Sequence, residues 1–169
     1  MTISELATRI DLNATAPIVG VLVALIALIF QTRRSRLALA TESILSLTDR
    51  VNSSRLRHLR RTAAGRLINH EDDNRELSEV LDFFSTIAIL VYSKALNKDL
   101  AFREFSWWMI RYWACAKEYV DTERKTDPGA WKTLERVVTR FATLEKKWGY
   151  PLDEHLEEFL QSEAQLAQC

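Results

Sequence analysis

The longest uninterrupted run of apolar residues lies close to the N-terminus. It reads APIVGVLVALIALIF, ends at Phe30 and carries no charge. With the two residues before it, the segment has about 17 residues, the short end of what crosses a hydrocarbon core of roughly 30 Å. The pattern predicts a transmembrane helix over residues 14–30. The alternative is a buried helix inside a helical bundle.

The charges that flank this segment predict its orientation. Arg33, Arg34 and Arg36 follow it, whereas the charges of the tail at residues 1–13 nearly cancel. Because positive charge collects on the cytoplasmic side of a membrane, we expect the tail to face outward and residues 31–169 to be cytoplasmic. The predicted location is the cell (inner) membrane, with a single pass.

Apolar residues beyond this segment recur at spacings of three and four, the period of an amphipathic helix. The first stripe leads out of the predicted span and consists of Leu37, Ala40, Ile44, Leu47 and Val51. Its seam-like spacing is typical of a helix packed against others. Further stripes predict helices whose first apolar residues are Leu56, Leu77, Phe102, Trp131 and Leu152.

Helix start and stop signals separate these stripes. In chain order they are a cap or kink at Asn52-Ser53-Ser54, a capping box from Asp73 to Glu76, a helix end at Asn97, a cap at Asp99, a cap at Asp127 before Pro128, and a stop at Gly149 and Pro151. The chain has only 4 glycines and 3 prolines and no alternating strand pattern. We therefore predict an all-α fold: one N-terminal transmembrane helix followed by a cytoplasmic antiparallel helical bundle of about five helices.

Charge is balanced over the chain but not along it. The chain has 23 basic and 23 acidic residues. Basic residues dominate from 31 to 70, and no Lys or Arg follows Lys147, where the charges are acidic. This asymmetry suggests that the basic front and the acidic tail meet, within one chain or between chains. The candidate binding residues on the two sides are Arg57, Arg60, Arg61, Glu157 and Glu158.

The most aromatic of the predicted helices has two apolar sides. Phe105, Trp108 and Tyr112 share one face, while Trp107 and Ile110 point the opposite way. Such a helix either lies between two layers or presents an interaction surface. Since tryptophan is enriched at binding hot spots, Trp107 and Ile110 are candidates for partner binding.

Small residues inside the predicted span offer a second kind of contact. Gly20, Ala24 and Ala27 are spaced so that two such helices could approach closely in a bilayer. They are candidates for packing of the span.

The motifs of the common enzyme and cofactor classes are absent from the sequence. The glycines are isolated, so no phosphate-binding loop is formed. No histidine follows a glutamate by three residues, as di-iron bundles require, and no zinc-type cysteine pair occurs. The two cysteines are expected to be reduced thiols. We therefore predict no enzymatic activity, no cofactor and no metal site.

Two stretches carry a resemblance to a bacterial protein family. They are Leu81-Asp82-Phe83-Phe84-Ser85-Thr86-Ile87-Ala88 and, one helix later, Ile110-Arg111-Tyr112-Trp113. Together with the N-terminal span and its arginine-flanked exit, they resemble a family of small single-span membrane proteins that share a domain of unknown function. The similar region runs from about Val19 to Trp148. The resemblance implies an α-helical cytoplasmic domain on a membrane tether, and it supplies no catalytic or ligand residues.

These features predict a membrane-anchored binding or scaffold protein. It would contact the bilayer through residues 14–30 and hold a partner protein, or assemble as a homo-oligomer, at the cytoplasmic face. The acidic tail argues against a nucleic-acid partner, because it would repel one. The alternatives are an accessory subunit of a membrane enzyme or transporter, and an effector that perturbs the membrane through its oligomerised span.

Overall fold

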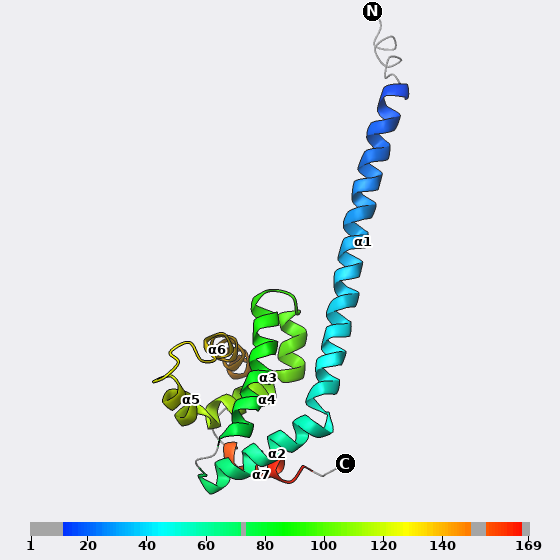
Figure 1. Ribbon diagram of the computed structural model, residues 1–169. Helices are drawn as coiled ribbons and strands as arrows, with labels where there is room; N and C mark the ends of the chain where they lie inside the picture. The colour runs from blue at the N-terminus through cyan, green and yellow to red at the C-terminus, as the bar shows by residue number, and fades with distance from the viewer. Residues whose placement is uncertain (1–11, 72–73, 150–154, 167–169) are drawn as a thin grey trace, which may run out of the picture. The chain divides into compact units, whose positions relative to one another are not determined.

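The computed structural model describes residues 12–71, 74–149 and 155–166 of the 169-residue chain, and it describes their side chains except at 12–20, 22, 23 and 32–40. These residues form helices and no strand (Figure 1). The helices are α1 (Leu12–Val51), α2 (Ser54–Asn69), α3 (Arg75–Tyr92), α4 (Lys98–Cys115), α5 (Lys117–Glu123), α6 (Lys132–Lys147) and α7 (Leu156–Ala164). The predicted all-α class is confirmed.

Helix α1 contains the apolar run. The chain divides into two compact units, Met1–Thr41 and Glu42–Cys169, and the boundary between them falls within α1. A search of the described residues finds no helix that combines the length and the apolar character needed to cross a membrane. The structure therefore does not support the predicted span over 14–30.

Several residues named from the sequence lie outside the described side chains. They are Gly20 of the small-residue set, Leu37 and Ala40 of the first stripe, and the three flanking arginines, Arg33, Arg34 and Arg36. Asp73, Pro151 and Leu152 lie outside the described residues altogether.

The second unit begins within the last turns of α1. Ile44, Leu47 and Val51 are buried there, as their spacing predicted. The Ser53 side chain accepts a hydrogen bond from the Leu56 backbone N–H and caps α2. The predicted cap between the first two stripes is confirmed, and it starts a new helix directly after α1 ends.

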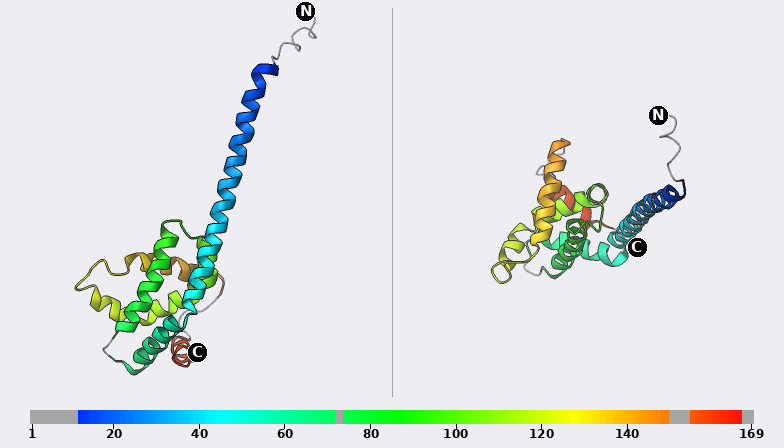
Figure 2. Two further views of the ribbon diagram at one scale, coloured as in Figure 1. Left: turned by 45° about the vertical axis from the view of Figure 1, so that its right-hand side comes forward. Right: turned by 90° about the horizontal axis from the view of Figure 1, so that it is seen from above.

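The bundle is built on α3 and α4, which are joined by a tight turn. Helix α3 packs against α2, α4 and α6, and α4 packs against α3, α6 and α7. Helix α7 also lies along α2, and both lie at the lower end of the bundle in the two views (Figures 1 and 2). Because α4 is covered on more than one side, its two apolar faces are both used in the core.

This arrangement decides between the two interpretations of α4. Ile110 is 2% exposed, so it belongs to the core and cannot bind a partner directly. Trp107 is 50% exposed, so it lies at the surface. The two residues that the sequence grouped together therefore differ: Ile110 lies in the core and Trp107 lies at the surface of α4.

The helix end predicted at Asn97 and the helix starts predicted at Asp99 and Asp127 were wrong. Helix α3 ends at Tyr92, and the Asn97 side chain accepts hydrogen bonds from the Asp99 and Leu100 N–H groups as the N-cap of α4. Asp127 accepts a hydrogen bond from Gly129 N–H in a turn, and α6 begins only at Lys132. Both side chains bond to the backbone as expected of Asn and Asp, but in a different register.

The capping box predicted from Asp73 to Glu76 involves a residue outside the described ranges; Glu76 itself forms an ion pair with Arg66 of α2. The predicted stop after the helix of Trp131 is confirmed. Helix α6 ends at Lys147, and Gly149 has φ 81°, the left-handed conformation that glycine adopts most easily.

The cap assignment at α4 can be tested by two substitutions. Asn97→Ala removes a side chain that satisfies two backbone N–H groups, and it is expected to lower the free energy of unfolding by about 1 kcal/mol. Asp99→Ala removes only a favourable charge from the first turn, and salt of about 1 M screens that contribution. Denaturant unfolding at high salt should therefore separate the two variants. Equal losses would mean that Asp99 shares the capping role.

Candidate partner-binding surfaces

A buried ion pair joins the two ends of the bundle. Arg60 of α2 donates from Nε to Glu163 Oε2 at 2.6 Å and from Nη2 to Glu163 Oε1 at 2.7 Å. The side chains are 3% and 6% exposed. A bidentate arginine–carboxylate contact of this length is the strong form of a charge-assisted hydrogen bond. The basic front and acidic tail thus meet within one chain, at this pair.

Further hydrogen bonds complete the environment of Glu163. Trp108 Nε1 donates to its Oε1 at 3.2 Å, and the Tyr112 hydroxyl lies 2.8 Å from its Oε2. Arg60 uses Nη1 to donate to the Val51 carbonyl at 3.1 Å, and its guanidinium also lies over the Trp108 ring. Helices α2 and α4 therefore donate to the carboxylate of α7, and α1 joins the network through the Val51 carbonyl that accepts from Arg60.

The tyrosine of this network stays protonated. Burial, and after it the negative charge of Glu163, raise the pKa of Tyr112 well above its usual value. The hydroxyl can therefore donate to Glu163, and it also lies 3.1 Å from the Arg60 carbonyl. The contribution of this group to folding stability is complete below the normal tyrosine pKa. It is lost as the pH rises from that value through the raised pKa of the folded state.

The remaining charged candidates stay at the surface. Arg57 and Arg61 are half-buried, and Arg61 contacts His58 Nδ1 at 3.4 Å. Glu157 and Glu158 are exposed at the start of α7, where Glu158 lies 3.2 Å from His155 Nδ1. Only Arg60, which the network buries, is removed as a candidate for partner contact.

Trp107 covers a second buried ion pair. The Arg111 guanidinium carbon lies 3.2 Å from the centre of the Trp107 ring, and Arg111 Nη1 donates to the Trp107 carbonyl at 3.2 Å. The same nitrogen lies 3.7 Å from Glu145 Oε2 of α6. Arg111 and Glu145 are 4% and 6% exposed. The half-exposed indole is thus the outer cover of a charged group in the interior.

This second pair is less well satisfied than the first. Burial lowers the pKa of Arg111, and the charge of Glu145 opposes that effect. Ser106 Oγ donates to Glu145 Oε1 at 3.3 Å, while Oε2 is buried without a hydrogen bond to a described residue. A buried, incompletely bonded carboxylate is costly. The Arg111–Glu145 pair is therefore the less well satisfied of the two buried pairs.

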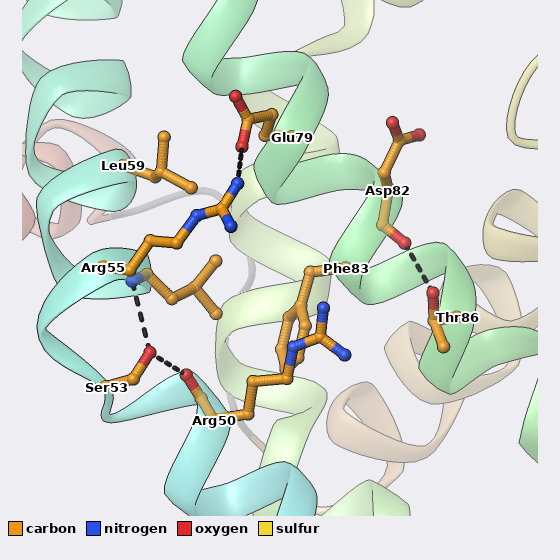
Figure 3. A pocket seen from close by; sticks show the side chains of 9 residues that line it. Arg50, Ser53, Arg55, Leu59, Glu79, Asp82, Phe83 and Thr86 are labelled. Carbon is orange, nitrogen blue, oxygen red and sulfur yellow. Dashed lines mark hydrogen bonds and ion pairs between the residues drawn. The ribbon is translucent and has the colours of Figure 1, made fainter.

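A groove between the end of α1, the start of α2 and α3 has a volume of about 270 Å³ (Figure 3). Its charged side chains are all engaged. Arg55 pairs with Glu79 at 3.1 Å, Arg50 lies over the Phe83 ring, and Asp82 accepts from Trp131 Nε1 at 2.8 Å. Each charged side chain of the groove therefore has a contact within the bundle.

No group of three or more His, Cys, Asp or Glu side chains within the described ranges is arranged to hold a metal ion. Cys115 is a free thiol whose pKa burial raises to about 11, so it is a poor nucleophile at neutral pH.

Ala24 and Ala27 of the small-residue set are exposed on α1.

Sequence reasoning missed the acidic halves of both pairs. Glu145 lies on the apolar side of α6 with Leu134 and Phe141, and Glu163 lies one turn after Phe159 on the apolar side of α7. A single acid on an apolar helix face signals a buried partner, because a carboxylate is rarely buried unpaired. The signal does not identify the partner, which lies 34 residues before Glu145 and 103 before Glu163.

Removing one member of the first pair tests its role. Arg60→Met leaves Glu163 charged and buried, and it is expected to lower the free energy of unfolding by about 3–5 kcal/mol. The double variant Arg60→Met/Glu163→Met should recover most of the lost free energy of unfolding, since neither charge remains. Arg55→Met, which breaks an exposed pair, serves as the control and should change stability by less than about 1 kcal/mol. Urea unfolding in mild detergent measures all three, and additive losses in the double variant would refute the pairing.

Comparison with known families gives one match. A family described as a domain of unknown function, DUF4760, matches residues 14–141. Comparison with curated proteins and with solved structures gives no match. The matched region includes Arg60, Trp107 and Arg111 but ends before Glu145 and Glu163. It confirms the resemblance to an uncharacterised family, while membrane insertion and bacterial origin stay predictions. The chain belongs to the DUF4760 family.

Proposed function

We propose that this protein is a membrane-anchored helical binding protein, which holds a partner protein or a second copy of itself at the cytoplasmic face of the inner membrane. The observation that carries the proposal is the combination of an exposed apolar helix segment in the first unit with an exposed tryptophan over a buried ion pair in the second.

The apolar segment of α1 exposes side chains that are stable only in contact with lipid or with another protein surface. Val21, Leu25, Ile26, Leu28, Ile29 and Phe30 are each between 50% and 68% exposed. At about 100° per residue these six side chains cover roughly 200° of the helix circumference, and the exposed Ala24 and Ala27 lie in the remaining arc. A helix that is apolar on all sides is stable in a bilayer or inside a protein, but not in water. The arginines that follow in the sequence favour the bilayer and a cytoplasmic second unit.

Trp107 is the best candidate for partner contact in the second unit. Its ring is fixed by stacking on Arg111, so little side-chain entropy is lost when a partner covers it. Fixed tryptophans next to arginine are typical of binding hot spots.

Self-association is a second possibility for the anchor. Ala24 and Ala27 are exposed and one turn apart on α1, and small residues allow the backbones of two membrane helices to approach. In this form, the effector alternative, the protein would act through an oligomerised span.

The anchor can be tested with aspartates in the apolar segment. Leu25→Asp and Ile29→Asp are each expected to cost about 3 kcal/mol for insertion, enough together to abolish it. Flotation with membranes in about 1 M salt, which removes charge-driven adhesion, should retain the wild type and release the double variant. Leu45→Asp is the matched control on α1, because Leu45 is 60% exposed but lies outside the segment. A wild type that fails to float would refute the anchor.

The partner surface can be tested with Trp107→Ala. Mild-detergent purification of the tagged full chain, followed by mass photometry, should show a partner or a second copy with the wild type and its loss in the variant. Ile89→Ala is the control, since Ile89 is 53% exposed on α3 and lies in neither proposed binding surface. Circular dichroism should be unchanged for both variants. Loss of folding in Trp107→Ala would instead mean that the residue is structural.

A further inference from the structure

The outer face of α6 carries only basic charge. Its exposed charged residues are Lys132, Arg136, Arg140, Lys146 and Lys147. At about 100° per residue they lie within an arc of roughly 120°, opposite the buried residues Leu134 and Phe141. The row extends over about 22 Å at 1.5 Å per residue.

The two acids of α6 do not neutralise this face. Glu135 pairs with Arg124 at 2.9 Å, and Glu145 lies in the interior beside Arg111. None of the five basic side chains forms an ion pair with a described residue. The face therefore has an unbalanced positive charge.

A cavity of about 680 Å³ adjoins the middle of this face, where the turn between α3 and α4 meets α6. Lys94, Lys98 and Arg140 line it, together with Tyr92 and an apolar floor that includes Phe141. The lining contains no carboxylate among the described residues. Three cations thus surround a partly apolar hollow with no anion to balance them.

The turn holds these cations in place. Lys94 has φ 61°, and the Leu96 N–H donates to the Leu90 carbonyl at 2.9 Å, which closes the turn. Asn97 then caps α4 directly before Lys98. The cationic side chains therefore start from a fixed backbone and not from a loose loop.

Two aromatic side chains lie at the rim of this surface. Tyr92, in the cavity lining, is 53% exposed, and Trp148, next to Lys147, is 58% exposed. The Phe102 ring lies 5.3 Å from Phe141 and 5.2 Å from Trp148, so a continuous row of rings joins the cavity floor to the exposed indole. Tyrosine and tryptophan beside lysine and arginine are typical of groups at a membrane–water interface.

We infer that this surface, the outer face of α6 with the Lys94/Lys98/Arg140 cavity, binds the anionic phospholipids of a bilayer surface, with one headgroup phosphate in the cavity. Five of its seven cations are lysines, which are depleted from protein–protein interfaces. A lipid surface needs no matched positions for these flexible charges, whereas a protein partner does. The inference goes beyond the anchor, since it requires no insertion of α1.

The test uses the full chain carrying Leu25→Asp and Ile29→Asp, so that insertion of α1 cannot contribute. Co-sedimentation is measured with vesicles of phosphatidylglycerol and phosphatidylcholine, and with phosphatidylcholine alone. We expect binding only to the anionic vesicles, and its loss in about 1 M salt. Replacing Lys94, Lys98 and Arg140 together by glutamine should weaken binding about 100-fold, since each basic group near the surface contributes about fivefold.

The matched control replaces Arg103, Lys117 and Lys125 by glutamine. These residues are exposed and the net charge changes equally, but none lines the cavity. An equal loss in both triple variants would overturn the site in favour of general charge attraction. If the chain binds poly-glutamate but not the vesicles, the lipid proposal is overturned and the surface is assigned to an acidic protein. Neither result bears on the anchor, which flotation of the wild type at high salt tests separately.

Discussion

The Arg60–Glu163 ion pair joins α2 to α7, two helices of the second unit that lie far apart in the sequence. Its two residues are 103 positions apart, and the pair is buried, bidentate and hydrogen-bonded by Tyr112 and Trp108. Such a pair adds little to stability compared with an apolar contact of the same size, but it is specific, because any other docking of α7 leaves a charge in the core. It therefore fixes where the short last helix lies.

Arginine supplies the internal ion pairs, and lysine is left outside. Arg60, Arg66, Arg111 and Arg124 pair with carboxylates of other helices or loops, while no lysine does so among the described residues. The planar guanidinium forms two parallel bonds and is less strongly hydrated than an ammonium group, so it is easier to bury. Because these arginines form ion pairs with carboxylates of the chain, fewer carboxylates remain to balance the lysines, and a chain with no net charge still has a strongly basic face on α6.

The two proposed binding surfaces use different physics and can coexist. Trp107 offers a rigid aromatic side chain over a desolvated ion pair, which suits a specific protein contact. The α6 face offers many mobile cations around a small hollow, which suits a surface of diffuse negative charge. With an anchored α1, lipid contact of the α6 face would limit the orientations of the second unit and hence the direction in which Trp107 is presented.

The sequence alone determined the all-α class, the helix break at Asn52-Ser53-Ser54, the buried stripe from Ile44 to Val51 and the end of α6 near Gly149, because periodicity and capping act between residues a few positions apart. It also indicated that the basic front and acidic tail would meet. Which residues meet was decided only by packing: α4 lies between layers, so Ile110 is buried and Trp107 is not, and α7 docks so that Glu163, not Glu157 or Glu158, reaches Arg60. Contacts over such separations depend on the whole arrangement of helices, which no local pattern encodes.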